Sequence, residues 1–540
     1  MEDEKNVKLN HRKNATMNGY LEISDSRVNE DKKKKMMNEA IAAEIRTRMQ
    51  EISEDIVDHV NVRVNYMVSE VFNKFDKSLQ NSNDLNNKYY DKRKLSKESI
   101  LPEKQFLERN SLLTDLFNTN EHIRTVYNIF LTILILLFIN TITYDIADGG
   151  SGGNIFRINA GINTIIYSFG KLSSVLYIWI LMKLSTFGIY IPVYIWSHKR
   201  LDFLPSSFAL KVWDYGWLAG YVLYLIIFII LPSKAVVDEL LPVASSTIIL
   251  LEQVRMLMKS YAFIRSTTPQ FLKYKIHADM TKPKLPDFSK YLYFLFAPTL
   301  IYRDHYPRTR CIRWKFVLWN YLEILLIIFY IAFLYERFFM PMYIKHGTKP
   351  IKKEELLANI INTSLPGILF FLCGFYCLLH AWLNASAEIL RFADRMFYKD
   401  WWNSSSYSVY YRTWNVVVHD WLYAYVYKDV FEILTNQNRI IATSSVFVLS
   451  VLVHEYILYF VFKFFCPAIL FMFGFVGFPL TFITRKVGNI FLWFSLILGN
   501  GIICSMYAVE FFGRKNCVSN PDKFLDFILP KILYCNPRSE

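Results

Sequence analysis

The 540-residue sequence is poor in charged residues, in residues that interrupt secondary structure and in cysteine. Asp, Glu, Lys and Arg make up 20% of it, and it holds 19 Gly, 18 Pro and 7 Cys. These low numbers exclude a chain that is disordered throughout, a collagen-like repeat and a small protein held together by disulfides. The H-E-x-x-H spacing of zinc proteases and the G-x-S-x-G turn of serine hydrolases are also absent. We therefore expect neither a metal site nor a cofactor.

Hydrophobic residues make up 53% of the chain, and after about residue 120 they form long apolar runs. A helix needs about 20 mainly apolar residues to cross a bilayer. Nine segments come close to this length or exceed it, namely residues 125–145, 163–196, 214–232, 240–263, 315–338, 362–383, 440–464, 466–484 and 489–512. The second of these is long enough to bend or divide. The sequence therefore predicts an all-α membrane protein with about nine transmembrane helices behind a polar N-terminal arm.

The formal net charge is +14. Lys and Arg collect at the cytoplasmic ends of membrane spans, and we prefer this explanation to a polyanionic partner such as a nucleic acid. Lys92, Arg93, Lys94 and Lys97 precede the first apolar run, which begins near Val126 without a signal peptide before it. We therefore expect a cytosolic N-terminus and, with an odd number of spans, a C-terminus on the other side of the membrane.

Within the N-terminal arm, apolar residues recur every three or four positions, as on one face of a helix. They are Ile41, Ile45, Met49, Ile52, Ile56, Val60, Val64, Val68, Val71 and Phe75. One interpretation is self-association between chains. The other is a helix that folds back on its own domain or on the membrane surface.

His454 lies midway through an apolar run and is followed by Glu455. Ionisable residues inside a membrane segment are costly and point to function. Imidazole is the usual general base near neutral pH, which makes His454 a candidate catalytic residue. The alternative is a histidine that only forms a structural hydrogen bond.

Residues 397–423 form a tract that is both polar and aromatic, with Asn415 and His419 among many Trp and Tyr side chains. It is too polar for a helix that faces lipid. Such a segment is tolerated at membrane depth only if it is buried in protein or lines a cavity. The alternative is an interfacial aromatic belt, which leaves the clustered Asn, Asp and His unexplained.

Cys517 and Cys535 lie in the polar tail that follows the last apolar run. A tail in an oxidising lumen favours a disulfide between them. In a cytosolic tail they would remain free thiols.

Residues 397–403, Phe-Tyr-Lys-Asp-Trp-Trp-Asn, resemble the FYxDWWN signature of sterol O-acyltransferases, which belong to the membrane-bound O-acyltransferase superfamily. The resemblance continues through residues 412–423 and 453–456, and is dense from about 290 to 465. Diacylglycerol acyltransferases have a related signature but tend to have Glu at the position of Asp400. The resemblance therefore favours a sterol acceptor.

The resemblance implies a role for each matching residue. His454 and Asn415 would be catalytic, and the disulfide would join Cys517 to Cys535 in the lumen. The acyl-CoA contacts would be Arg412, Asn415, His419, Tyr427, Arg439, Ser450 and Val409. The motif and substrate tunnel would comprise Phe397, Tyr398, Asp400, Trp401, Trp402, Asn403 and Trp414. Val409 and Arg439 depart from the family, which often has Asn and Lys there.

The resemblance further implies a multi-pass enzyme of the endoplasmic reticulum membrane that esterifies a sterol with a fatty acyl group from acyl-CoA. It would comprise a cytosolic arm (1–120), a catalytic transmembrane domain (121–515) and a lumenal tail (516–540), and would form a homodimer or homotetramer among membrane lipids. One alternative acceptor is diacylglycerol or a long-chain alcohol. A different class of function is a proton-coupled transporter.

Overall fold

The structure is a computed structural model. It describes residues 44, 45, 47–49, 101–149, 161–205, 207–274, 281–348, 352–435, 437–483, 488–518, 522, 525 and 528–531. The chain divides into two compact units, Met1–Ser99 and Ile100–Glu540. In the first unit, the described residues Glu44, Ile45 and 47–49 are helical. Most of the predicted N-terminal stripe therefore lies outside the described residues.

The second unit is built from helices, and its described residues contain no strand beyond two isolated bridges. The first half contains α2 (Leu112–Thr119), α3 (Glu121–Gly149), α4 (Ile162–Ser168), α5 (Leu172–Gly188), α6 (Tyr190–Arg200), α7 (Phe208–Asp238), α8 (Val243–Lys273), α9 (Phe288–Phe296), α10 (Trp314–Leu334), η2 (Tyr335–Phe339) and α11 (Met340–Tyr343). The second half contains α12 (Lys353–Phe375), η3 (Tyr376–Trp382), α13 (Leu383–Ile389), η4 (Trp401–Asn403), α14 (Tyr407–Thr413), α15 (Val416–Leu422), η5 (Tyr423–Tyr427), η6 (Val430–Leu434), α16 (Arg439–Phe462), η7 (Leu470–Gly477), α17 (Phe478–Leu480) and α18 (Asn489–Asn516). The prediction of an all-α fold is confirmed.

Seven of the described helical segments are long and apolar enough to cross a membrane. They are Glu121–Asn140, Leu172–Arg200, Phe208–Asp238, Trp314–Tyr343, Lys353–Ile389, Arg439–Phe462 and Asn489–Asn516. The predicted count of nine is not confirmed. The two remaining candidates are helical, but α8 carries several charged side chains and Leu470–Leu480 is short. The long second candidate divides into α4, α5 and α6, as its length suggested.

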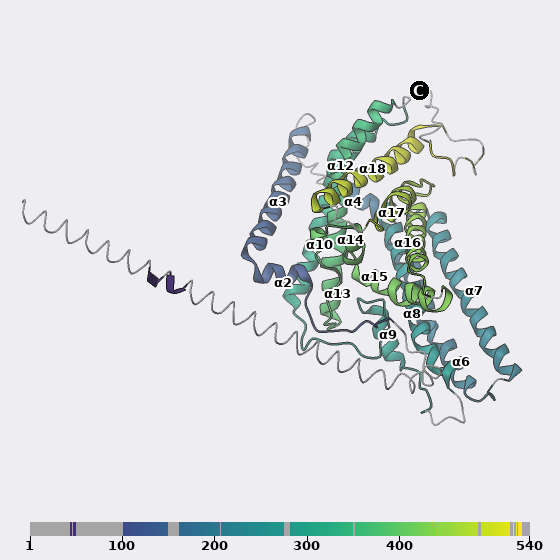
Figure 1. The fold of residues 1–540 in the computed structure, drawn as a ribbon. Helices are drawn as coiled ribbons and strands as arrows, with labels where there is room; N and C mark the ends of the chain where they lie inside the picture. Colours follow the sequence, from purple (N-terminus) through teal and green to yellow (C-terminus); the bar gives the residue numbers. More distant parts are fainter. Residues whose placement is uncertain are drawn as a thin grey trace, which may run out of the picture. The chain divides into compact units, whose positions relative to one another are not determined.

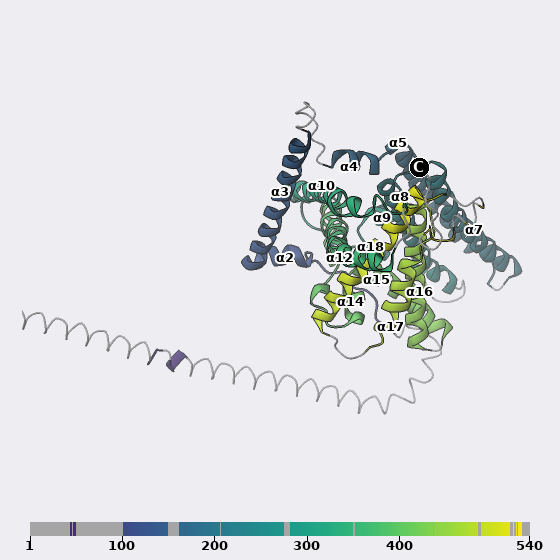
Figure 2. The same cartoon turned by 90° about the horizontal axis from the view of Figure 1, so that it is seen from above.

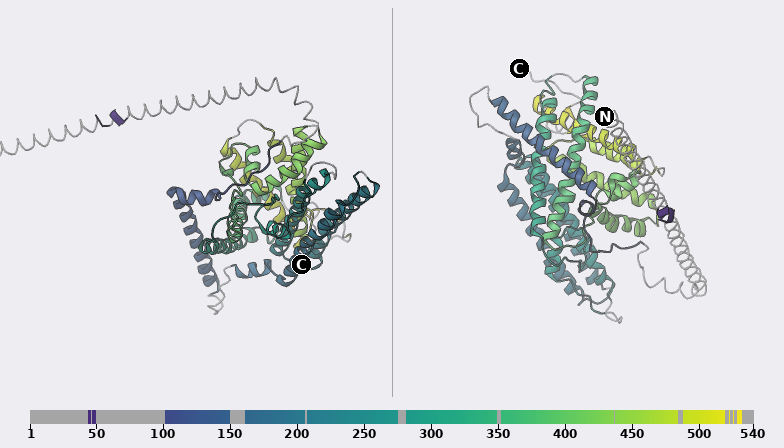
Figure 3. Two further views of the ribbon diagram at one scale, coloured as in Figure 1. Left: turned by 90° about the horizontal axis from the view of Figure 1, so that it is seen from below. Right: turned by 90° about the vertical axis from the view of Figure 1, so that its left-hand side faces the viewer.

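The long helices form two neighbouring groups (Figures 1 and 2). In one group α12 packs along α18, and α10 packs against α13 and η3. In the other, α5, α7 and α16 all contact α8. The α3 helix stands at the edge of this unit beside α10, and the long helices run side by side when seen from that edge (Figure 3).

The one buried charged side chain among the described residues of α8 is satisfied within the protein. Lys259 is 1% exposed, and its Nζ donates hydrogen bonds to the carbonyl oxygens of Phe294 and Ala297, each at 2.6 Å. These carbonyls lie at the end of α9, where a helix offers unpaired acceptors to a cation. Burial of this kind explains why a segment poor in hydropathy can lie in the centre of a membrane protein.

The segment before α2 belongs to the second unit and packs against its helices, although the sequence assigned it to the arm. Arg109 forms an ion pair with Asp394 (2.7 Å), and Lys428 donates a hydrogen bond to the carbonyl oxygen of Leu101 (2.8 Å). The Phe106 ring packs edge-on against Tyr306, with ring centroids 5.2 Å apart. Residues 101–109 therefore form a strap across the helical body.

Candidate active site

His454 is held by α16, one of the membrane-crossing candidates. This helix begins at a side-chain cap, because Asn438 Oδ1 accepts hydrogen bonds from the backbone N–H groups of Ile440 (3.0 Å) and Ile441 (3.2 Å). It ends where Lys463 adopts a left-handed conformation, with φ of 59°. His454 thus projects from regular helix, four residues after Ser450.

The His454 ring has a defined tautomer in its neutral form. Its Nδ1 lies 2.7 Å from the backbone carbonyl oxygen of Ser450. A carbonyl oxygen can only accept, so Nδ1 carries the hydrogen. The lone pair of the neutral ring is then on Nε2, which is the atom available to accept a proton. The side chain is exposed in the protein alone, so this atom is accessible to a substrate.

The side chains of Glu455 and His454 point in different directions. The glutamate is 9% exposed, whereas the histidine is exposed. Neighbouring residues on a helix point about 100° apart at 3.6 residues per turn. The two side chains therefore face different surroundings despite being adjacent in sequence.

Asn415 caps the start of α15. Its Oδ1 accepts a hydrogen bond from the backbone N–H of Val418 at 3.1 Å, the usual N-cap arrangement. With Oδ1 occupied, the Nδ2 group is left as a hydrogen-bond donor. Among the described residues no hydrogen bond joins Asn415 to His454, so a substrate would have to lie between them for both to act on it.

Three of the predicted acyl-CoA contacts border one cavity of about 270 Å³. Arg412, Val409 and His419 line it together with Met396, Lys399, Thr413, Val416 and Asp420. The Arg412 side chain is steadied by a hydrogen bond from its Nε to the carbonyl oxygen of Ser408 (2.9 Å). The Lys399 ammonium and the Arg412 guanidinium give this cavity a positive charge.

Asp420 is the acidic residue of this cavity, and it is neutralised by the strap. Lys104 Nζ lies 2.6 Å from Asp420 Oδ2, and both side chains are largely buried. Burial would raise the pKa of Asp420, but its hydrogen bond with His419 and the charge of Lys104 outweigh burial and lower that pKa below its usual value. The cavity therefore keeps the cationic character of Lys399 and Arg412.

Aromatic rings connect the cavity wall to the histidine. The Phe473 ring lies edge-on to His454, with centroids 5.6 Å apart, and 5.4 Å from Tyr411. Phe447, two helical turns before His454, contacts both Tyr411 (5.1 Å) and Phe473 (5.5 Å). Because Tyr411 directly precedes Arg412, the cation and the histidine are attached to one packed cluster.

The other predicted acyl-CoA contacts lie on two further helical faces. Tyr427 belongs to a column of stacked rings, His419, Tyr423, Tyr427 and Phe431, spaced four residues apart. Arg439 is exposed at the first position of α16, and Ser450 supplies the carbonyl that holds His454. Neither Tyr427, Arg439 nor Ser450 borders the cavity that Arg412 lines.

The residues of the 397–403 motif mainly build a core. Phe397, Tyr398 and Trp401 are each 1% exposed. The Trp401 ring contacts Trp414 (4.7 Å), Phe375 (5.1 Å) and Trp493 (5.6 Å), which joins α12, α14 and α18.

The rest of the motif is more accessible. Asp400 and Asn403 are exposed, whereas Trp402 is half-buried. The Trp402 carbonyl oxygen accepts hydrogen bonds from Asn489 Nδ2 (2.7 Å) and Trp493 Nε1 (3.1 Å). The motif therefore fixes the position of the segment that leads into Arg412 and Asn415.

Cys517 is fully buried at the end of α18. Cys535 lies outside the described residues, so the pairing of these two cysteines stays a prediction. The described residues contain no group of three or more His, Cys, Asp or Glu side chains arranged to hold a metal ion.

Comparison with known proteins identifies the family. Residues 209–509 match the model of MBOAT, the membrane-bound O-acyltransferase family. The chain is 40% identical over 437 residues to sterol O-acyltransferase 1 of Mus musculus, an alignment that covers 80% of this chain and 79% of that protein.

The chain belongs to the membrane-bound O-acyltransferase family.

Two further sterol O-acyltransferases are similar to the chain over a comparable length. Sterol O-acyltransferase 1 of Cricetulus griseus is 41% identical over 445 residues, covering 80% of this chain and 78% of that protein. Sterol O-acyltransferase 2 of Homo sapiens is 38% identical over 451 residues, covering 81% of each chain. The protein is therefore an acyltransferase and a multi-pass membrane protein.

Sequence reasoning missed some residues of this candidate site. Lys399 lies within the 397–403 motif, but the sequence analysis gave it no role. Its positive charge was the signal that could have suggested an anionic ligand, and in the folded chain it lines the same cavity as Arg412. Phe473 and Lys104 had no local signal, because their contacts with His454 and Asp420 arise only in the folded chain.

Proposed function

We propose that this protein transfers a long-chain fatty acyl group from acyl-CoA to the 3-hydroxyl of a sterol, forming a steryl ester and free CoA. The observation that carries this proposal is the identity of about 40% to sterol O-acyltransferases over four fifths of the chain. The histidine in an apolar helix, with an accessible Nε2, supports the chemistry.

His454 is proposed as the general base. As the sterol oxygen attacks the thioester carbon, the hydroxyl proton passes to Nε2. The new carbon–oxygen bond forms, the carbon–sulfur bond breaks, and the proton on the imidazolium is available to the departing CoA sulfur. The ring is oriented for this by the hydrogen bond from Nδ1 to Ser450. No covalent acyl-enzyme is required.

Asn415 is proposed to stabilise the oxygen that becomes negative on the thioester carbon. Its Nδ2 group is a donor, and its Oδ1 is held by Val418 so that the amide has one orientation. A donor aimed at such an oxyanion contributes about 10²-fold or more to the rate. Orientation of the acceptor hydroxyl is the other role that the same amide can fill.

Lys399 and Arg412 are proposed to bind the phosphates of CoA at the cavity that they line. Guanidinium and ammonium groups are the common partners of phosphate in proteins. His419, Val409, Tyr427, Arg439 and Ser450 remain proposed acyl-CoA contacts. Asp400, Trp402, Asn403 and Trp414 remain proposed tunnel residues, and Phe397, Tyr398 and Trp401 support them from the core.

We further propose the endoplasmic reticulum membrane as the location, with residues 1–120 in the cytosol, residues 121–515 as the catalytic domain and residues 516–540 in the lumen. A disulfide between Cys517 and Cys535 is proposed in the tail. A homodimer or homotetramer is proposed as the assembled state, and no cofactor is proposed beyond the acyl-CoA substrate.

The acceptor is tested by competition. Membranes containing the expressed protein receive labelled oleoyl-CoA together with equal amounts of cholesterol and a diacylglycerol, and the labelled lipids are separated. We expect label in steryl ester, above membranes without the protein. Label confined to triacylglycerol, or transfer to neither acceptor, would reject the proposed sterol specificity.

A further inference from the structure

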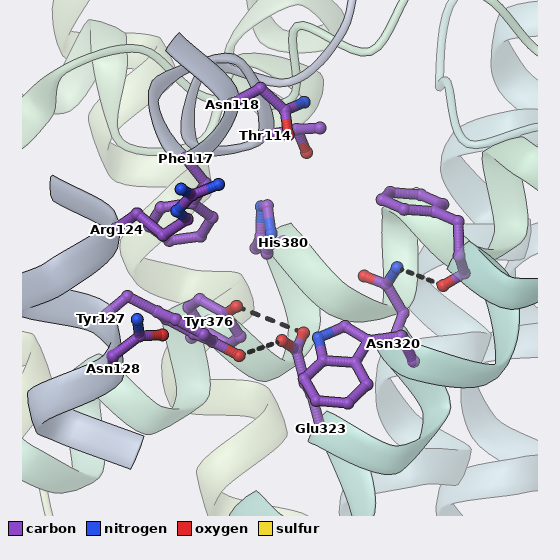
Figure 4. A pocket seen from close by; sticks show the side chains of 12 residues that line it. Thr114, Phe117, Asn118, Arg124, Tyr127, Asn128, Asn320, Glu323, Tyr376 and His380 are labelled. Carbon is purple, nitrogen blue, oxygen red and sulfur yellow. Dashed lines mark hydrogen bonds between the residues drawn. The ribbon is translucent and has the colours of Figure 1, made fainter. Parts of the chain in front are cut away.

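A second cavity, of about 230 Å³, lies between the first membrane-crossing helix and the rest of the body. Its walls come from α2, α3, α10 and η3, and it shares no residue with the cavity lined by Arg412 (Figure 4). None of its residues was assigned a role in acyl transfer. Its lining combines a carboxylate, a guanidinium and several aromatic rings.

Glu323 supplies the carboxylate. Tyr127 donates a hydrogen bond to Glu323 Oε1 (2.6 Å), and Tyr376 donates one to Oε2 (3.2 Å). Figure 4 shows the two hydroxyls converging on the carboxyl group from one side. The two hydroxyls and the side chain of Trp319 favour the ionised form of Glu323, whereas burial opposes it. Among the described residues no cation is found among the groups that act on Glu323, so a cationic ligand would supply the partner that a buried negative charge normally has.

Asn320, one turn before Glu323 on α10, leaves an unused acceptor beside it. Its side chain is 2% exposed, and its Nδ2 donates to the carbonyl oxygen of Phe316 at 2.7 Å. Its Oδ1 is buried without a hydrogen-bond partner, and in Figure 4 this oxygen points into the cavity. An unsatisfied buried acceptor costs free energy, so a ligand that brings N–H donors would be favoured here.

A cationic group bound in the cavity would also contact the faces of aromatic rings. Phe117, Tyr127, Trp319 and Tyr376 all line it. The rings of Phe117 and Tyr127 pack against each other with centroids 4.9 Å apart. Aromatic faces attract ammonium groups, and the attraction is stronger out of water.

Arg124 lines the same cavity from α3, one turn before Tyr127, and its side chain is exposed. Its guanidinium suits a phosphate. The cavity thus offers a cation to one part of a ligand and a carboxylate, an amide oxygen and aromatic rings to another part. This arrangement matches a small zwitterion with both a phosphate and an ammonium group.

We propose that this cavity binds the headgroup of an ethanolamine phospholipid, with its ammonium at Glu323 and Asn320 and its phosphodiester at Arg124. A primary ammonium has three N–H donors, which can satisfy both Asn320 Oδ1 and the Glu323 carboxylate. The trimethylammonium of choline has none and would leave Asn320 Oδ1 unpaired. A membrane lipid is the source because α3 exposes Ile129, Phe130 and Ile133, an apolar surface along which acyl chains can lie.

The test uses the full-length protein, purified in detergent and incubated with equal amounts of phosphatidylethanolamine, phosphatidylcholine or phosphatidylglycerol of identical acyl chains. Native mass spectrometry measures the lipid retained. We expect phosphatidylethanolamine to be retained about ten-fold more strongly than the other two, the size of effect that a charge-assisted hydrogen bond gives. Glu323→Gln should remove most of that preference, whereas Arg124→Gln should lower the retention of all three lipids, because each of them carries the phosphodiester.

Two matched variants control for loss of charge alone. Glu121→Gln and Arg310→Gln change exposed residues outside the cavity and should keep the preference. Equal retention of all three lipids by the unmodified protein would overturn the proposal without reliance on any variant. Soluble glycerophosphoethanolamine binding as tightly as the lipid would overturn the membrane source. These readouts do not depend on acyl transfer, so the proposal can fail while the proposed function stands.

Discussion

The Nδ1 atom of His454 lies 2.7 Å from the backbone carbonyl oxygen of Ser450, one turn earlier on α16. This contact determines which ring nitrogen carries the hydrogen in the neutral histidine. It also orients the ring, because the partner is part of the helix backbone and does not move independently of it. A base in this position therefore needs no third residue to set its tautomer, and Glu455 is turned away from it.

Substitution of Asn415 can separate its two roles. Asn415→Asp keeps an oxygen that caps α15 but removes the Nδ2 donor, so we expect kcat to fall about 10²-fold or more with little change in melting temperature. Asn415→Ala should lose both, with a further cost of about 1 kcal/mol in stability from the missing cap. The measurements are steady-state kinetics and thermal unfolding of purified protein.

The control for Asn415 is another capping residue. Ser207 caps α7 by accepting a hydrogen bond from the N–H of Leu210 (3.1 Å). Ser207→Ala should lower stability by about 1 kcal/mol and leave kcat unchanged. Full activity in Asn415→Asp would show that only the cap matters.

Neutralising the cations of the first cavity should weaken binding of acyl-CoA. Lys399→Gln and Arg412→Gln are each expected to raise the KM for acyl-CoA about ten-fold at low salt, because each removes a charged phosphate partner. Arg310→Gln, an exposed change outside the cavity, should leave KM unchanged. Kinetics at two salt concentrations test this, and an unchanged KM in both cavity variants would refute the phosphate role.

The ion pair between Lys104 and Asp420 should stabilise the fold in a pH-dependent way. Lys104→Met is expected to cost about 1–3 kcal/mol at pH 7, because a largely buried carboxylate loses its charged partner. The pKa of Asp420 is lowered in the folded protein, so the stabilisation is complete above the unfolded value of about 4 and is lost as the pH falls below it.

Thermal unfolding of the two proteins between pH 3 and 8 checks this expectation. The difference between Lys104→Met and the unmodified protein should shrink in acid. Lys345→Met, which changes an exposed lysine, should show almost no difference at any pH. A difference that grows as the pH falls would contradict the ion-pair account.

The Trp401 side chain should matter for stability more than for substrate binding. Trp401→Ala is expected to cost about 3–5 kcal/mol, because it leaves a hole among Phe375, Trp414 and Trp493. Asp400→Asn, an exposed change next to it, should alter stability by less than about 0.5 kcal/mol. Thermal unfolding measures both. A Trp401→Ala protein of normal stability but raised KM would indicate direct substrate contact instead.

Patterns of local sequence predicted the helical fold and the position of most spans, because runs of apolar residues are sufficient for that inference. They also predicted a span at residues 240–263, which is not confirmed, because α8 is not among the seven candidates in the described residues. Its Lys259 is buried and donates hydrogen bonds to three carbonyl oxygens of the region around α9. Such compensation depends on packing between distant segments.

In the candidate site, too, some residues could be predicted from the sequence and others could not. His454 and Asn415 were recognisable from the sequence, and Arg412 and His419 do border one cavity. The strap was not recognisable, since no sequence pattern near Lys104 indicates its ion pair with Asp420, which lies far along the chain. The motif around Trp401 predicted a tunnel, and whether any of its side chains touches substrate stays a prediction.

The most direct test of the account is steryl ester formation by the His454→Ala protein. Equal amounts of unmodified and variant protein, each shown to be inserted in the membrane, are assayed with labelled oleoyl-CoA and cholesterol. The account predicts rapid labelling of steryl ester by the unmodified protein and none above background by His454→Ala. Labelling by His454→Ala at the rate of the unmodified protein would contradict the role of His454 as the base.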